Sequence, residues 1–75
     1  MKIEVLGMGC VKCEMLYDNA KKAVEKKNIQ AEVLKVEDMD KITNYGVMMT
    51  PALVIDGEVK TAGKIPTVEE ITKWL

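Results

Sequence analysis

The chain opens on an alternation of polar and apolar residues that is typical of a β-strand. Residues 2–6 read Lys-Ile-Glu-Val-Leu, and Gly7 follows them as a turn signal. From Cys13 onward the apolar residues recur instead at helical spacing: Leu16, Tyr17, Ala20, Ala23 and Val24. We therefore expect a first strand and then a helix of about four turns that ends near Asn28.

The middle of the chain predicts a second strand and a short helix. Residues 31–36 read Ala-Glu-Val-Leu-Lys-Val, and a right-handed crossover from the first strand would make this strand parallel to it. Asp38 is suited to cap a short helix, which Gly46 would end. We expect this helix to direct three side chains inward: Met39, Ile42 and Tyr45.

The last third of the chain predicts a hairpin and a final helix. The apolar run 52–55 is followed by Asp-Gly at 56–57, a strong type I′ turn signal, and by a strand over 58–60. A Thr-x-x-Glu capping box over 67–70 begins the helix. Its inward residues would be Val68, Ile71 and Leu75, with Trp74 along its edge. The predicted order is β-α-β-α-β-β-α, an α/β fold with a four-stranded mixed sheet and helices on both faces.

Length and composition indicate a single domain over residues 1–75. This length leaves no material for two cores, and 48% hydrophobic with 31% charged residues is typical of a folded chain. So short a chain buries a modest core, and we expect a surface site. The basic residues are all lysine and the formal net charge is −1, which argues against nucleic-acid binding. The lack of histidine excludes His-based triads, zinc ligands and general bases.

The sequence shows neither the pattern of a signal peptide nor that of a transmembrane helix. We therefore expect a cytoplasmic protein without a membrane partner. A near-neutral chain with no evident exposed apolar stripe gives no reason to expect more than a monomer. Structural disulfides are rare in the cytoplasm, so the two cysteines, Cys10 and Cys13, are candidates for redox or metal chemistry.

The Cys-x-x-Cys spacing at the start of the first predicted helix makes the two sulfurs inequivalent. Cys10 falls at the N-terminal end, where unpaired N–H groups and the helix dipole stabilise a thiolate, and Cys13 lies one turn further on, toward the core. Lys12 is a candidate for tuning the pKa of Cys10 downward, while Glu14 acts against it. A Cys10 thiolate can attack a disulfide and Cys13 can then displace the client, a cycle that needs no metal or cofactor.

Three features together resemble the thioredoxin superfamily over nearly the whole chain. They are Cys10-Val11-Lys12-Cys13 after a first strand, Thr50-Pro51 ahead of a buried strand, and the Asp-Gly hairpin. The chain is similar to small, stand-alone redox-active disulfide proteins of glutaredoxin size. This resemblance implies a thioredoxin-like fold and a thiol–disulfide oxidoreductase, with Cys10 attacking and Cys13 resolving. It also implies that Pro51 is a cis-proline whose loop, with Thr50, pairs with an extended client. The partners would be protein disulfide clients and a disulfide reductase.

A second resemblance indicates metal binding. Met8-x-Cys10-x-x-Cys13 resembles the metal-binding loop of heavy-metal-associated domains, whose two thiolates would carry a soft ion such as Cu(I). The Met48-Met49 pair could add thioethers there, or could offer apolar surface to clients. That fold has the order β-α-β-β-α-β and ends in a strand, so the conformation of residues 67–75 discriminates between the two hypotheses. A structural zinc site needs more ligands than this chain supplies.

Overall fold

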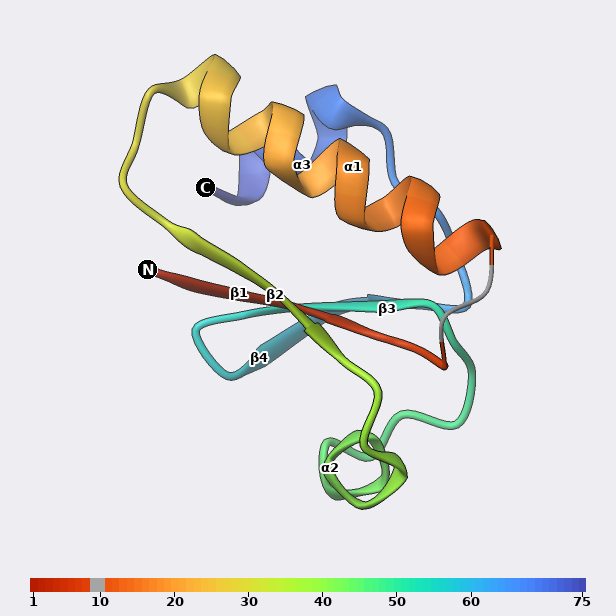
Figure 1. Cartoon of the computed structure of the whole chain (residues 1–75). Helices are drawn as coiled ribbons and strands as arrows, with labels where there is room; N and C mark the ends of the chain where they lie inside the picture. Colours follow the sequence, from red (N-terminus) through yellow and green to blue (C-terminus); the bar gives the residue numbers. More distant parts are fainter. Residues whose placement is uncertain (9–10) are drawn as a thin grey trace.

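The computed structural model describes residues 1–8 and 11–75; Gly9 and Cys10 lie outside the described residues. Its elements are β1 (Lys2–Leu6), α1 (Val11–Lys27), β2 (Glu32–Val36), α2 (Met39–Asn44), β3 (Ala52–Ile55), β4 (Glu58–Ala62) and α3 (Val68–Trp74) (Figure 1). This order confirms the one predicted from the sequence. Within these two described stretches, no helix combines the length and the apolar character that crossing a membrane requires.

The strands form one mixed sheet in the order β2-β1-β3-β4. β1 runs parallel to β2, with Ile3 opposite Val33, and antiparallel to β3, with Val5 opposite Leu53. β3 and β4 are antiparallel, and a register shift after Leu53 interrupts their ladder. The parallel pair is the one that α1 connects, as expected for a strand-helix-strand crossover.

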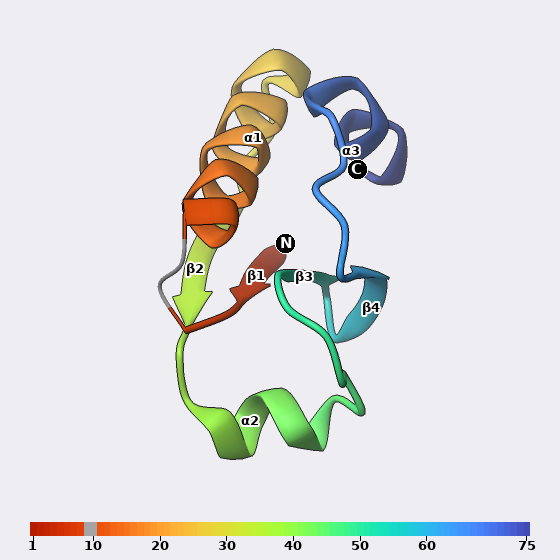
Figure 2. The same ribbon diagram turned by 90° about the vertical axis from the view of Figure 1, so that its right-hand side faces the viewer.

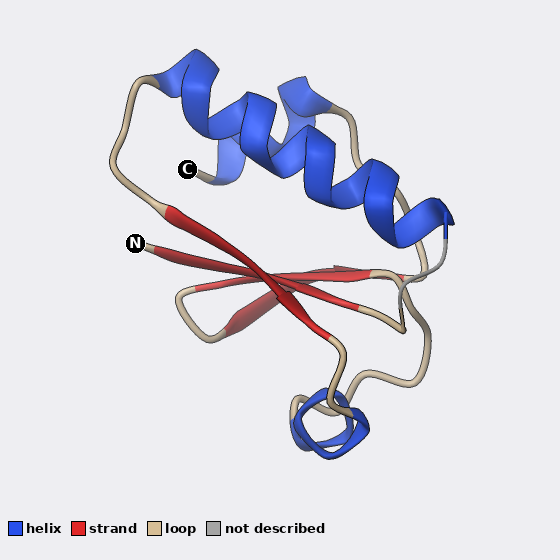
Figure 3. Ribbon diagram, viewed as in Figure 1, coloured by secondary structure: helices blue, strands red, loops and turns tan. Residues whose placement is uncertain are grey.

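Helices cover both faces of this sheet and give the molecule three layers. α1 and α3 lie side by side on one face, and α2 lies on the other (Figures 1 and 2). Figure 3 shows the same layers by type of element. Because side chains alternate across a strand, β1 sends Ile3 and Val5 toward α1 and α3, and Leu6 toward α2.

This alternation produces two hydrophobic cores. The larger core, between the sheet and the helices α1 and α3, contains Ile3, Val5, Leu16, Ala20, Ala23, Leu53, Ile55 and Ile71. The smaller core, under α2, contains Leu6, Ile42, Ala52 and Val54. The apolar residues of α1 thus face the larger core, as their helical spacing predicts.

The capping and turn signals of the sequence act as predicted. The Asp38 side chain accepts a hydrogen bond of 2.9 Å from the backbone N–H two residues on and caps α2. Thr67 and Glu70 form the capping box of α3. Asp56 and Gly57 have φ angles of 50° and 83°, the left-handed pair that a type I′ hairpin turn requires.

Two predicted details are wrong. Met39 was expected to point inward, but it is 57% exposed, because α2 has only six residues and Ile42 is the one that reaches the smaller core. The last strand of the hairpin runs to Ala62 and not to residue 60, because the chain resumes pairing with Ala52 after the register shift.

Candidate active site

The candidate site lies at one end of the sheet, where β1 ends, α1 begins and the loop before β3 returns to the sheet (Figure 1). Cys13 is the third residue of α1 and is only 6% exposed. It lies on the same stripe of the helix as Leu16 and Ala20, which carry it toward the sheet. The predicted burial of Cys13 is confirmed, whereas the prediction for Cys10 falls outside the described residues.

Gly7 is the point at which the three segments of the site meet. A Cβ atom on Gly7 would overlap the Cys13 sulfur and would lie 3.9 Å from the Thr50 Cβ. The missing side chain therefore lets Cys13 and Thr50 approach the end of β1 together. The sequence pattern predicts Gly7 only as a turn residue. Its place between a strand and the cysteine motif is the feature that could have indicated this role.

The loop before β3 is held by its proline. The Thr50–Pro51 peptide bond is cis, and the Pro51 side chain is fully buried while Thr50 is exposed. The Gly63 N–H donates a hydrogen bond of 2.8 Å to the Pro51 carbonyl, which ties this loop to the segment after β4. The structure thus brings Thr50 to the Cys13 side of the sheet and fixes it there.

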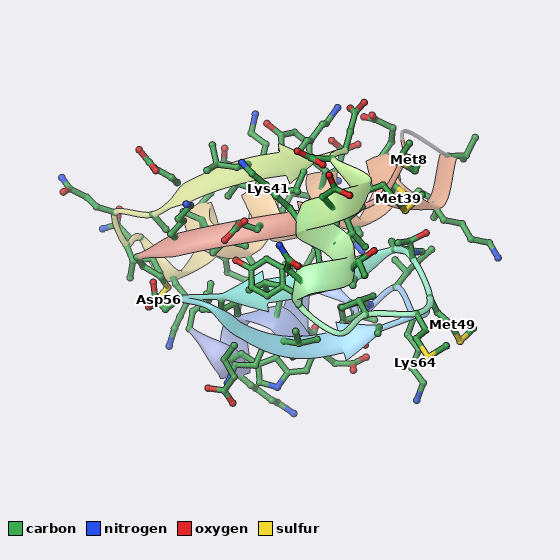
Figure 4. All side chains as sticks on the ribbon, turned by 90° about the horizontal axis from the view of Figure 1, so that it is seen from below. Met8, Met39, Lys41, Met49, Asp56 and Lys64 are labelled. Carbon is green, nitrogen blue, oxygen red and sulfur yellow. The ribbon has the colours of Figure 1, made fainter. Side chains whose placement is uncertain are left out.

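Exposed apolar side chains surround this end of the molecule. The exposed fractions are 58% for Met8, 77% for Val11, 97% for Met48 and 64% for Met49. In Figure 4, Met8, Met39 and Met49 lie at one end of the molecule and Asp56 lies at the opposite end. Unbranched methionine side chains adapt to irregular apolar partners, so the exposed apolar surface at this end is adaptable in shape.

Charged side chains near Cys13 come from α1, from β2 and from Glu37, which follows β2. Lys12, the predicted tuning residue, is exposed on α1. The Lys35 Nζ of β2 donates a hydrogen bond of 2.7 Å to the Glu14 carboxylate of α1. This hydrogen bond raises the pKa of Lys35. The sequence gives no local signal for Lys35, because it lies 21 residues from Glu14 and only the parallel pairing of β1 with β2 brings the two together.

The end of the chain discriminates between the two resemblances. Among residues 1–8 and 11–75, no group of three or more histidine, cysteine, aspartate or glutamate side chains is arranged to hold a metal ion, but Cys10, a ligand in the metal-binding hypothesis, lies outside these residues. Residues 68–74 form the helix α3, whereas the heavy-metal-associated fold would end in a strand.

A four-stranded mixed sheet with helices on both faces, and a buried cysteine in the first turn of the helix α1, define the class of thioredoxin-like proteins. The Thioredoxin domain family model matches residues 1–75. The chain is 44% identical over 75 residues to a protein named Thioredoxin from Methanothermobacter thermautotrophicus, an alignment that covers 100% of this chain and 97% of the relative. It is 45% identical over 73 residues to a protein named Thioredoxin from Methanocaldococcus jannaschii, covering 97% of this chain and 84% of the relative.

The chain therefore belongs to the thioredoxin family. This membership makes it a thiol–disulfide oxidoreductase, of the general kind that acts on protein disulfides. The fold class and the enzyme class expected from the sequence are both confirmed.

Proposed function

We propose that Cys10 and Cys13 form the dithiol of this oxidoreductase, with Cys10 as the attacking cysteine and Cys13 as the resolving one. The observation that carries the proposal is the burial of Cys13 against Gly7, at 6% exposure. A thiol so enclosed is poorly accessible to a disulfide of another protein, so the first attack falls to the chain's other cysteine, three residues earlier in the sequence.

The reaction proceeds by two thiol–disulfide exchanges. The Cys10 thiolate attacks one sulfur of the client disulfide, and the other client sulfur leaves as a thiolate that takes up a proton. Cys13 then loses its proton and attacks the Cys10 sulfur, which releases the second client thiol and leaves Cys10 and Cys13 joined. Two electrons pass to the client, and a disulfide reductase returns two electrons to the pair. No metal or cofactor takes part in these steps.

Two features support Cys10 as the attacking group. It directly precedes Val11, the first residue of α1, and the positive end of a helix dipole favours a thiolate at such a position. Lys12 adds a positive charge in the same turn. We assign Lys12 the role of tuning this thiolate.

We assign client binding to the loop before β3. Thr50 is exposed next to Cys13, and Pro51 anchors the loop, so an extended client segment can pair with the main chain there. The exposed methionines Met48 and Met49 supply apolar surface for its side chains. We propose that the protein works in the cytoplasm, where a reductase can keep the dithiol reduced.

Serine substitution of each cysteine tests the two roles. Cys13→Ser is expected to accumulate a mixed disulfide between Cys10 and a protein disulfide substrate, seen as a shifted band on a non-reducing gel. Cys10→Ser is expected to lose all exchange activity. Full disulfide-reducing activity in Cys10→Ser would overturn the assignment of roles.

Equilibration against thiol–disulfide buffers tests the dithiol itself. The oxidised fraction, read by mass after alkylation, is expected to show a reversible intramolecular disulfide with a potential between about −180 and −280 mV. Absence of that disulfide across this range, or thiols shielded by a co-purified soft metal, would contradict the proposal and favour a metal carrier.

A further inference from the structure

An open cavity lies between β1 and α2, on the face of the sheet opposite to the one that carries Cys13. Its volume of about 300 Å³ is at the lower end of the range for small-molecule sites. Figure 4 looks onto this face and shows Lys41 between Asp56 and the end of the molecule that carries Met8 and Met49. The cavity is therefore separate from the candidate active site. It is lined by Lys2, Glu4, Lys41, Asn44 and Tyr45.

Glu4 supplies a buried negative charge to this cavity. The residue is only 6% exposed, and its Oε1 atom accepts a hydrogen bond of 2.7 Å from the Tyr45 hydroxyl. Residues 1–8 and 11–75 supply no donor to the second oxygen, Oε2. No fully enclosed side-chain oxygen in this part of the chain lacks a partner, so Oε2 is open to the cavity. A carboxylate this deeply buried is stabilised by a further donor, most strongly by a cationic one.

Two lysines supply the positive charges at the rim of the cavity. Lys2 extends from β1 and Lys41 from α2, and both residues are exposed. Neither ammonium group forms an ion pair with a carboxylate in the described part of the chain. Asn44 adds an amide with both a donor and an acceptor. The cavity thus presents two positive groups around one negative group.

We propose that this cavity binds a small acidic α-amino acid such as glutamate or aspartate. Such a ligand carries one ammonium group and two carboxylates, the exact complement of the charges that line the cavity. Its ammonium group donates to the open oxygen of Glu4, and its carboxylates accept from Lys2 and Lys41. Binding uses neither cysteine, so the site goes beyond the proposed dithiol function.

Binding at this site joins α2 to β1, because Lys41 and Asn44 belong to α2 while Lys2 and Glu4 belong to β1. α2 has only six residues, and a ligand that binds only its packed form stabilises that form. We therefore expect saturating ligand to slow the hydrogen exchange of the α2 amides.

Titration of the full chain with L-glutamate, followed by NMR of the backbone amides at constant ionic strength, tests the site. Saturable shifts are expected at Glu4, Lys41, Asn44 and Tyr45, with a Kd of about 1 mM or lower. N-acetyl-L-glutamate lacks the ammonium group, and L-glutamine lacks the second carboxylate. Each is therefore expected to bind about tenfold more weakly than L-glutamate.

A matched lysine provides the control variant. Lys41→Met removes one rim charge and is expected to weaken the binding of L-glutamate about tenfold. Lys73 is an exposed lysine of α3 that does not line the cavity, so Lys73→Met is expected to leave the Kd unchanged. The proposal would be overturned by a Kd above about 10 mM, by equal binding of L-glutamate and N-acetyl-L-glutamate, or by equal losses in the two lysine variants. Both lysines are exposed, so neither variant depends on repacking a core.

Discussion

The two faces of the sheet bury different kinds of material. On the face covered by α1 and α3, the described core residues are all apolar, and Cys13 packs at the end of this layer. On the face covered by α2, the smaller core lies beside Glu4, which is 6% exposed and accepts a hydrogen bond of 2.7 Å from the Tyr45 hydroxyl. The candidate site is thus built on the face with two helices, while the other face closes the sheet with one short helix and one part-buried polar pair.

The largest loss of unfolding free energy is expected from truncating one buried side chain in each core. Leu16 is fully buried in the larger core, and Leu16→Ala is expected to cost about 3–5 kcal/mol of unfolding free energy. Ile42 lies in the smaller core on a helix of only six residues, and Ile42→Ala is expected to cost about 2–3 kcal/mol, because α2 can adjust to fill the space. Denaturant unfolding measures both values. An equal or larger loss for Ile42→Ala would contradict the expectation that the larger core contributes more to stability than the smaller core.

Gly7→Ala tests how tightly the site is joined to β1. The added methyl group would overlap the Cys13 sulfur, so we expect a loss of about 1–3 kcal/mol together with a marked fall in the rate of disulfide exchange. Gly46→Ala is the control on the α2 side. Gly46 has φ 76° with no atom near its Cβ position, so we expect a loss of about 1 kcal/mol from the left-handed backbone and unchanged exchange. Unchanged exchange in Gly7→Ala would show that Cys13 does not depend on this contact.

The sequence predicted the fold far better than it predicted the surroundings of the site. Caps and turns depend on residues close together in the chain, so Asp38 and the 56–57 turn could be read directly. The contact of Lys35 with Glu14 depends on strand register, and the burial of Glu4 depends on where α2 settles. An alternating strand shows which residues share a face, but not how deeply a helix covers that face.

Tyr45→Phe removes the one donor that the described structure shows for the Glu4 carboxylate. Because Glu4 is buried, we expect a loss of about 1–2 kcal/mol at neutral pH, with exchange activity unchanged. The Glu4 hydrogen bond, and then burial, raise the pKa of Tyr45 above its usual value of 10.0. The stabilisation is therefore complete below about pH 10 and is lost as the pH rises through the higher pKa of the folded state.

Denaturant unfolding of the native protein and of Tyr45→Phe across this pH range tests whether the stabilisation is lost as the pH rises. The difference in unfolding free energy between the two proteins should narrow at alkaline pH. A difference that widens there would contradict the hydrogen bond to Glu4 as the source of the effect.

The smallest effects should come from the helix caps, and they sharpen the comparison of the two faces. Thr67 caps α3, whose Ile71 belongs to the larger core, so Thr67→Ala is expected to cost about 1 kcal/mol of global unfolding free energy. Asp38 caps α2, and Asp38→Ala is expected to appear mainly as faster hydrogen exchange of the α2 amides, with a smaller global loss, because this short helix can open while the larger core stays intact. Amide exchange and denaturant unfolding on both variants separate the two responses. Equal losses of global unfolding free energy, with no local opening of α2, would mean that the two faces of the sheet unfold as one unit. The site would then depend on the α2 face as much as on the face that carries Cys13.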